Sequence, residues 1–477
     1  MKKNNDISNL SSPAVGGEQG AIYFIGIGGI GMSAIARYFH SKGIKVSGYD
    51  KTETALTKKL TQEGIPVHYT DDVNLIPKKV DLVVYTPAIP KEQTELQYYN
   101  KNGFKVVKRS DVLQTISEDS FNICVAGTHG KTTVSCMIAH ILRHSGFGCN
   151  AFLGGISANY NTNFWSSENN VCVIEADEYD RSFLKLSPDI SVITAMDADH
   201  LDIYGDEPTM QQAFIDFGNK TKNGGLVLSK FGLKRIQEIK TERKLVYSLG
   251  NESADAYASE IQILEGGYVF NVNLPNAMLS NIQIKIGGMH NVENMVAAIV
   301  VVNELEIAAE KIKRAVADFQ GVKRRFEYII PPKPKQKGEY NYPVFIDDYA
   351  HHPEELKALL KSARALFNQR KITVIFQPHL FTRTRDFADE FASSLSIANE
   401  VILLPIYPAR ELPIEGVTSE MIFNKISSEK KLLSKEELLH WAKKMDINKE
   451  FGEVIITAGA GDIDALVQPL KEIILQK

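Results

Sequence analysis

The chain is short of cysteine and has no long apolar run. Both absences narrow the classes of protein to which it can belong. Its 477 residues include four cysteines, Cys124, Cys136, Cys149 and Cys172, none spaced as CxxC or CxH. Without that spacing, we interpret them as free thiols in a reducing cytoplasm. No apolar run approaches the roughly 18 residues of a spanning helix, so no membrane insertion is expected.

Charge of either sign is not in excess. A net charge of -4 gives no reason to expect nucleic acid or an anionic membrane as a partner. The first residues hold two lysines but no hydrophobic core, so they lack the pattern of a signal peptide. We predict a disordered polar tail over residues 1–18, and no oligomeric state is predicted.

The stretch 121–146, FNICVAGTHGKTTVSCMIAHILRHSG, has the pattern of a nucleotide-binding loop. A buried strand over residues 123–125 leads into AGTHGKTT, and apolar residues then recur at helical spacing up to Gly146. Backbone N–H groups of such a loop converge on phosphate oxygens. Lys131 would reach the outer phosphates, and the Thr132 hydroxyl would be a ligand for magnesium. The strict phosphate-loop pattern has glycine where this chain has Val125, so the match is a GxxGKT variant.

A second glycine turn lies near the start of the ordered chain. Gly26, Gly28 and Gly31 match GxGxxG between a strand and a helix, and Asp50 follows the next strand about 20 residues on. This is the dinucleotide fingerprint, but the same turn serves any diphosphate. Two readings stay open from the pattern alone: NAD, or a nucleotide-linked substrate beside the ATP loop. The strand within residues 80–90 would end facing that ligand.

Two later strands run into acidic segments. EADEYD carries Glu175 at the end of one strand, and DADHLD carries His200 after the next. Ligands of open α/β sheets gather beyond the carboxyl ends of strands, so both residues are candidate magnesium ligands. Asn291 and Asn294 lie one turn apart at the start of an apolar helix, where they would either cap it or contact a base.

The last third of the chain repeats strands with polar ends. The strand within residues 344–355 ends in two acids and two histidines. The strand within residues 371–391 ends in a proline turn, with Arg383 and Arg385 ahead of a helix. Arginines there could fork onto a carboxylate. The alternation predicts an α/β fold of three domains: a Rossmann-like domain at 19–118, a central P-loop ATPase-type domain at 119–328, and a Rossmann-like C-terminal domain at 329–477.

Ten motifs then occur in one order from about residue 20 to 470, and together they resemble the Mur ligase family of peptidoglycan synthesis. They are GIGGIGMS, AGTHGKTT, EADEYD, DADHLD, MHNVEN, RRFE, DDYAHHP, FQPHLFTRTRD, YPARE and GAGDI. The resemblance implies an ATP-dependent cytoplasmic ligase that joins L-alanine to the lactyl carboxylate of UDP-N-acetylmuramate through an acyl phosphate. Mg²⁺ is the implied metal, and the GxGxxG turn would hold the UDP-sugar diphosphate rather than NAD.

The resemblance also implies roles for individual residues. Those for ATP are Gly127, Thr128, His129, Gly130, Lys131, Thr132, Thr133, His290, Asn291, Asn294, Arg325 and Asp348. Those for the UDP-sugar are Gly26, Gly28, Gly29, Gly31, Ser33, Asp50, Thr86 and Arg109. Those for the metal are Thr132, Glu175 and His200, and those for the amino acid are His379, Arg383 and Arg385. The catalytic set is Lys131, His200, His351, His352, His379 and Arg383.

One departure from the family pattern affects these roles. The family's PHRYTRTR often has arginine directly after the histidine, where this chain has Leu380, so Arg383 becomes the better candidate for that charge. The alternatives are a murein-recycling relative that joins a tripeptide to the same sugar, an NAD-dependent oxidoreductase, and a nucleotide-binding regulator without ligase turnover. FQPHLFTRTRD and GIGGIGMS favour the alanine-adding ligase.

Overall fold

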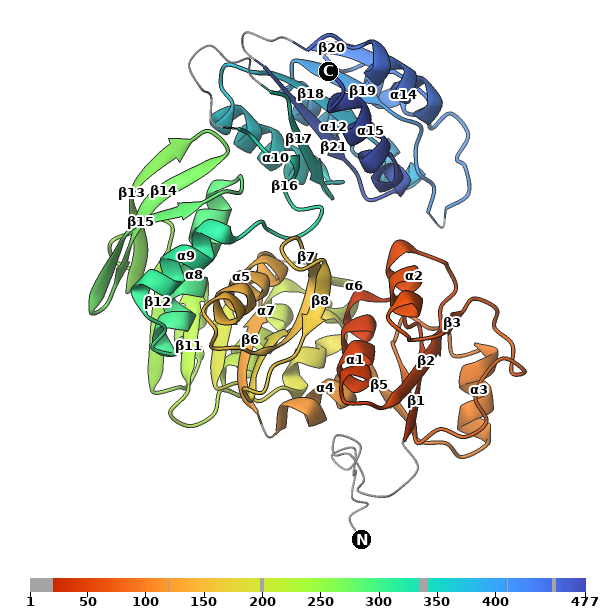
Figure 1. Ribbon diagram of the computed structural model, residues 1–477, viewed down its shortest axis with the longest axis vertical. Helices are drawn as coiled ribbons and strands as arrows, with labels where there is room; N and C mark the ends of the chain where they lie inside the picture. The colour runs from red at the N-terminus through yellow and green to blue at the C-terminus, as the bar shows by residue number, and fades with distance from the viewer. Residues whose placement is uncertain (1–19, 119, 198–200, 334–341, 410, 448–451) are drawn as a thin grey trace.

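Three β-sheets follow one another along the chain, one for each predicted domain, and confirm the α/β fold (Figure 1). The computed structural model describes residues 20–118, 120–197, 201–333, 342–409, 411–447 and 452–477. In Figure 1 the C-terminal domain, in blue, lies at one end of the molecule. The central domain, in yellow and green, and the N-terminal domain, in red, lie at the other end.

The first sheet is parallel, with strand order β3-β2-β1-β4-β5. Its strands are β1 (Ala21–Ile25), β2 (Lys45–Tyr49), β3 (Val67–His68), β4 (Leu82–Tyr85) and β5 (Val106–Lys108). Its helices are α1 (Ile30–Ser41), α2 (Ala55–Gln62), α3 (Thr94–Lys101) and α4 (Arg109–Glu118). The predicted apolar face of α1 is buried, including Met32, Ile35 and Phe39, so the helix is held firmly behind the glycine turn.

The central sheet has ten strands, in the order β15-β14-β13-β12-β11-β10-β6-β9-β7-β8. The strands are β6 (Phe121–Ala126), β7 (Asn150–Ser157), β8 (Thr162–Trp165), β9 (Val171–Glu175), β10 (Ile190–Ile193), β11 (Leu226–Lys230), β12 (Arg243–Ser248), β13 (Ala256–Leu264), β14 (Gly267–Leu274) and β15 (Ala277–Ile284). The helices are α5 (Lys131–His144), α6 (Leu201–Tyr204), α7 (Glu207–Gly218), α8 (Met289–Glu304) and α9 (Ala309–Asp318). Short 3-10 helices cover Tyr179–Lys185 and Ile236–Glu238. Strands β6, β9 and β10 are adjacent and parallel, so their carboxyl ends share one edge.

The third sheet has the order β16-β17-β21-β18-β19-β20. Its strands are β16 (Glu327–Ile330), β17 (Val344–Asp348), β18 (Lys371–Phe376), β19 (Glu400–Leu403), β20 (Glu429–Leu432) and β21 (Glu453–Ala458). Its helices are α10 (Pro353–Leu366), α11 (Phe381–Asp386), α12 (Ala388–Leu395), α13 (Glu420–Phe423), α14 (Lys435–Lys444) and α15 (Val467–Ile474), with a 3-10 helix at Asp462–Leu466. Arg383 and Arg385 lie ahead of α12, as predicted, but within a further short helix, α11, that was not predicted.

The N-terminal domain packs directly on the central sheet through α1. The Tyr38 ring lies 5.6 Å from the ring of Phe152 on β7 and 6.1 Å from that of Phe164 on β8. Arg37 of the same helix bonds to Glu63 and Asn163. These contacts bring the GxGxxG turn close to the phosphate loop. All four cysteines are buried and free, as predicted, and no helix among the described residues is long and apolar enough to cross a membrane.

Candidate functional site

The phosphate loop has the backbone that its glycines predict. It lies between β6 and α5, with Gly127 at φ 136° and Gly130 at φ 85°, a region that favours glycine. A Cβ at Gly127 would lie 2.3 Å from Thr194 Oγ1, so alanine does not fit there. No side chain caps α5 at Gly130, which leaves the first N–H groups of the helix available to an anion. Around this loop Thr128 and Thr133 are buried and His129 is exposed.

Lys131 lies in this loop with two acceptors. Its Nζ donates to Gly127 O at 2.6 Å and to Glu178 Oε1 at 2.7 Å. Burial raises the pKa of the Glu178 carboxyl, and the adjacent lysine opposes that shift. Glu178 was not among the predicted site residues. The EADEYD motif that contains it was visible, but it offers several carboxylates without showing which one meets the lysine.

Thr132 and Glu175 meet as the predicted metal pair. Thr132 Oγ1 donates to Glu175 Oε1 at 2.8 Å, and the other oxygen of Glu175 accepts from Gly154 N at 2.8 Å. A hydroxyl and a carboxylate are ligands that Mg²⁺ prefers, so the donor set fits that ion. His200 lies outside the described residues. Within the described ranges, no group of three or more His, Cys, Asp and Glu side chains could hold a metal.

The start of α8 borders the phosphate loop. Asn291 Nδ2 donates to Gly287 O at 2.6 Å, and Asn294 Nδ2 donates to Asn291 Oδ1 at 3.3 Å. A Cβ on Gly130 would lie 3.1 Å from Asn294 Oδ1, so Asn294 is next to the loop. Of the two readings from the sequence, Asn291 has the contacts of a residue that supports the helix start. His290 is exposed beside it.

On the predicted UDP-sugar side, Gly28 N donates to Asp50 Oδ2 at 2.8 Å. A Cβ on Gly28 would lie 2.7 Å from that oxygen, and one on Gly26 would lie 3.0 Å from Thr86 Cγ2, so both glycines allow close approach. Gly29 precedes α1 as its N-cap. The Ser33 side chain is buried, donates to Ile30 O, and accepts from Asn163 Nδ2; its contact with the UDP-sugar stays a prediction.

A cavity of about 210 Å³ lies between the predicted UDP-sugar side and the predicted metal pair. One wall comes from α1 at Gly31, another from Arg109, and a third from Glu175 and Asp177. Arg109 Nη2 donates to Asp177 Oδ2 at 3.2 Å, across the boundary between the first and second sheets. The cavity therefore places the candidate sugar site against the candidate metal pair.

Asp348 and Arg325 lie where the chain enters the third sheet. Asp348 accepts from Phe326 N and Ala350 N, both at 2.7 Å. Burial raises the pKa of Asp348 to about 6, while the two backbone donors and Arg325 oppose the shift. Arg325 is exposed beside this carboxyl.

The C-terminal domain brings His351 and His379 together from β17 and β18, which flank β21. Their ring centroids are 5.9 Å apart, and His379 also stacks on Tyr407 at 5.7 Å. His379 Nδ1 and Arg383 Nη1 are buried without a hydrogen-bond partner among the described residues, as expected of groups that await a ligand. Burial, His351 and Arg383 lower the pKa of His379.

Two other predicted residues of this domain have partners within the protein. The His352 ring packs on Phe387 at 5.0 Å, and Arg385 Nε donates to the neighbouring Asp386 at 2.7 Å. Leu380 has φ 72°, which is unusual for leucine, and its N–H donates to Tyr407 O. Leu380 therefore precedes α11 as its N-cap in a left-handed backbone conformation.

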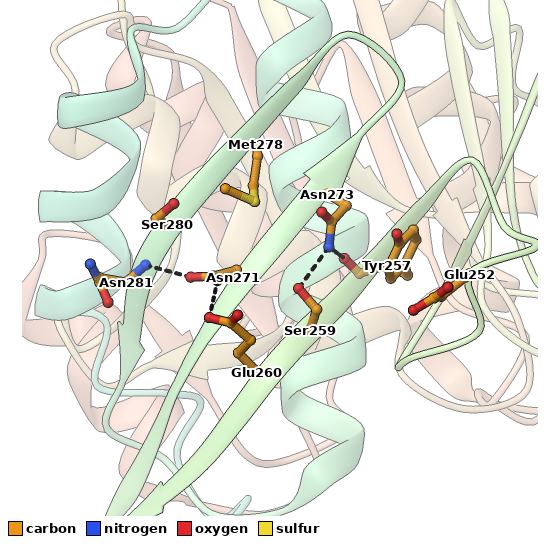
Figure 2. Close-up of a pocket in the computed structure, with 9 residues that line it drawn as sticks. All are labelled: Glu252, Tyr257, Ser259, Glu260, Asn271, Asn273, Met278, Ser280 and Asn281. Carbon is orange, nitrogen blue, oxygen red and sulfur yellow. Dashed lines mark hydrogen bonds between the residues drawn. The ribbon is translucent and has the colours of Figure 1, made fainter.

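Figure 2 shows a separate concave surface of about 690 Å³ on β13–β15, which contains none of the predicted site residues. Its polar groups bond to one another: Asn271 donates to Glu260 at 2.7 Å, and Asn273 donates to Ser259 at 2.8 Å. We interpret it as the solvated face of this antiparallel extension.

Family models cover most of the chain. They match the Mur ligase family catalytic domain at residues 21–120, the Mur ligase middle domain at 125–302, and the Mur ligase glutamate ligase domain at 324–461. The UDP-N-acetylmuramate–L-alanine ligase of Cytophaga hutchinsonii is 46% identical over 94% of this chain and 96% of its own. That of Phocaeicola vulgatus is 47% identical over 94% and 96%.

Solved structures agree with the fold. The UDP-N-acetylmuramate–alanine ligase of Thermotoga maritima matches with a TM-score of 0.79 and 28% identity, covering 96% of this chain and 99% of its own. A murein peptide ligase of Psychrobacter arcticus matches with a TM-score of 0.64 over 95% and 98%; at 21% identity it shows the fold alone. The chain belongs to the Mur ligase family.

Proposed function

We propose that this chain is an ATP-dependent ligase that joins L-alanine to the lactyl carboxylate of UDP-N-acetylmuramate, a step of peptidoglycan precursor synthesis. The observation that carries the proposal is the cavity between Gly31, Arg109 and Glu175, because Glu175 is bonded to Thr132 of the phosphate loop. A sugar carboxylate held there would lie next to the terminal phosphate of ATP. The names of the relatives, at 46–47% identity, support the choice of L-alanine.

The reaction needs activation because a carboxylate is a poor electrophile and oxide is a poor leaving group. The lactyl carboxylate attacks the γ-phosphorus of ATP, giving an acyl phosphate and ADP. The amine of L-alanine then attacks the acyl carbon, and phosphate leaves from the tetrahedral intermediate. Since charge moves but few protons do, positioning and charge neutralisation supply most of the catalysis.

The ATP side would be served by the phosphate loop and its neighbours. Lys131 and the N–H groups at the start of α5 would bind the β- and γ-phosphate oxygens. Thr132 and Glu175 would hold Mg²⁺, with His200 as a further ligand; the ion would offset charge on the transferred phosphoryl group. Asn294 borders the loop from α8, and Arg325 and Asp348 would approach the nucleotide from the third domain.

The amino-acid side would be served by the C-terminal domain. Arg383 would bind the alanine carboxylate with the guanidinium nitrogen that has no partner within the part of the chain that the structure describes. His379 would take the proton from the alanine ammonium, because its Nδ1 also lacks a partner and its lowered pKa favours the neutral form. His351 is a second candidate base, because its Nδ1 lies 2.9 Å from Tyr349 O and a proton donated there leaves Nε2 free to accept one.

We assign the UDP-sugar domain to residues 19–118, the ATP-binding domain to 119–328 and the amino-acid domain to 329–477. Strand β16 straddles the last boundary and pairs with β17 of the third sheet. Because the four cysteines are free, we expect the enzyme to act in the cytoplasm, where thiols stay reduced.

Mass spectrometry of the product tests the proposal. With ATP, Mg²⁺, UDP-N-acetylmuramate and L-alanine, the UDP-sugar should gain one alanine residue. The same mixture with L-alanyl-γ-D-glutamyl-diaminopimelate in place of alanine should give little product. A product formed only with the tripeptide would replace the proposal with the recycling reaction, and no product with either would reject ligase activity.

A further inference from the structure

The ammonium group of Lys131 is fixed by two contacts and has one donor left. An ammonium has three N–H donors. Two of them go to Gly127 O at 2.6 Å and Glu178 Oε1 at 2.7 Å. The lysine side chain is 15% exposed and the glutamate 1%, so the pair is largely buried and the lysine is its more accessible member.

Glu178 is itself firmly held. Its carbonyl oxygen accepts from Tyr204 Oη at 2.7 Å and from Arg181 N at 2.9 Å, which fixes the backbone at the start of the 3-10 helix. Its second carboxylate oxygen, Oε2, is buried without a partner among the described residues. A buried carboxylate is costly unless it is paired with a cation. The ion pair therefore constrains both side chains.

The neighbouring carboxylates of the same segment have other contacts. Glu175 accepts from Thr132, and Asp177 accepts from Arg109. Among the acids of this segment whose side chains the structure describes, Glu178 is the one that contacts the loop lysine, and the contact leaves Glu175 available for a metal.

We propose that Glu178 is a positioning residue, which holds the Lys131 ammonium over the phosphate loop with its third N–H directed to a nucleotide phosphate oxygen. The inference deepens the proposed function and rests on it, because it requires a nucleotide phosphate at this loop. Glu178 touches neither nucleotide nor sugar and acts only through Lys131.

A double-mutant cycle tests this dependence. Kinetics with varied ATP would be measured for the wild type, Glu178→Ala, Lys131→Ala and the double variant. Loss of a supporting residue of this kind typically reduces activity about 10- to 100-fold, and we expect that loss in kcat/KM for ATP with Glu178→Ala. In the Lys131→Ala background the same change should cost no more than about twofold. An equal loss in both backgrounds would overturn the proposal, because Glu178 would then act independently of Lys131.

Two conservative variants separate position from charge. Glu178→Gln keeps an acceptor oxygen at the same reach but removes the charge, whereas Glu178→Asp keeps the charge but withdraws it by one methylene. Positioning predicts that Glu178→Asp loses more kcat/KM for ATP than Glu178→Gln. The reverse order would show that charge alone matters and would contradict the proposal. These variants also carry the test if Glu178→Ala does not fold.

A matched control excludes a general effect of breaking a buried ion pair. Glu400 is 3% exposed and pairs with Lys371 at 2.6 Å in the third sheet, away from every predicted site residue. Glu400→Ala should lower the thermal midpoint yet leave kcat/KM for ATP within about twofold. An equal loss of kcat/KM in Glu400→Ala would assign the Glu178 effect to destabilisation.

ADP binding by calorimetry distinguishes this inference from the proposed function. If the wild type binds ADP but does not ligate alanine, the proposed function fails, and the cycle on ADP affinity still tests Glu178. If ADP affinity is unchanged in every Glu178 variant while the wild type ligates alanine, the positioning role fails and the function stands.

Discussion

At the scale of residues, one acidic segment contacts three parts of the site. Glu175, Asp177 and Glu178 bond respectively to Thr132, Arg109 and Lys131. The segment follows β9, which pairs directly with β6 ahead of the phosphate loop. One short stretch of backbone therefore contacts three residues with predicted roles: Thr132 for the metal, Arg109 for the sugar and Lys131 for phosphate.

Lys131→Ala tests the ATP site. Removing one preorganised charge donor typically lowers turnover about 10²- to 10³-fold, and we expect a loss of that size in kcat. Lys222→Ala is the matched control, because Lys222 pairs with Asp189 at 2.8 Å before β10, at the opposite edge of the sheet. It should keep turnover within about twofold. Near-normal turnover of Lys131→Ala, with the same thermal midpoint as the wild type, would reject the assignment of the ATP site.

Glu95 gives a pH prediction. It is fully buried, accepts from Tyr23 Oη at 2.7 Å, and burial raises its pKa from 4.5 to about 7. The folded protein therefore keeps a proton that the unfolded chain releases between about pH 4.5 and 7. Glu95 therefore contributes its full stabilisation below the unfolded pKa of 4.5, and this stabilisation is lost as pH rises through the folded pKa of about 7. Its size is about 1–3 kcal/mol.

Glu95→Gln should remove that slope. Unfolding by urea between about pH 5 and 8 should show the free energy of unfolding falling less with pH in the variant than in the wild type. At about pH 8 the variant should be at least as stable as the wild type, since its amide is never charged. Parallel pH profiles for the two proteins would contradict the raised pKa.

At the scale of elements, the two glycine turns are what the sequence predicts best. A strand, a glycine turn and a helix are specified within about 20 residues, and both units form where predicted, as β1–α1 and β6–α5. The departure at Val125 does not disturb the loop, because the residue lies fully buried within β6 and the turn begins at Gly127.

Contacts between distant elements were the part that the sequence could not predict. The bond of Glu178 to Lys131 depends on β9 lying beside β6 and on the 3-10 turn after β9, which no local pattern specifies. The contact of Ser33 with Asn163 likewise depends on the packing of α1 on β8. The antiparallel strands β13–β15 were likewise not anticipated, since their role is to extend a sheet formed elsewhere.

Gly28→Ala tests the first turn. Its Cβ would lie 2.6 Å from Thr57 Cγ2 and 2.7 Å from Asp50 Oδ2, so the contact between Gly28 N and Asp50 must shift. Overpacking of this kind costs about 1–3 kcal/mol, and we expect KM for UDP-N-acetylmuramate to rise roughly tenfold or more. The affinity for ADP, measured by calorimetry, serves as the control and should stay within about twofold. An unchanged KM for the sugar would remove this turn from the sugar site.

At the scale of the whole molecule, the predicted binding groups are divided among three domains. The sugar turn belongs to the first sheet, the phosphate loop to the second, and His379 with Arg383 to the third. Three substrates must meet in a site that excludes water, because an acyl phosphate hydrolyses readily. We therefore expect the outer domains to close on the central one when substrates bind.

Small-angle X-ray scattering checks this closure. The radius of gyration should fall when a non-hydrolysable ATP analogue and UDP-N-acetylmuramate are added together, and less with either alone. An identical scattering profile with and without both ligands would contradict closure. The residues predicted to bind the amino acid would then have to act from their present positions.

The most direct test of the account is phosphate release from ATP in the presence of UDP-N-acetylmuramate, measured with and without L-alanine. The account predicts strong release that requires both the sugar and alanine, and its loss in Lys131→Ala. Release that depends on a tripeptide but not on alanine would contradict the substrate. The absence of ATP turnover under either condition would show that the phosphate loop binds nucleotide without the chemistry proposed for it.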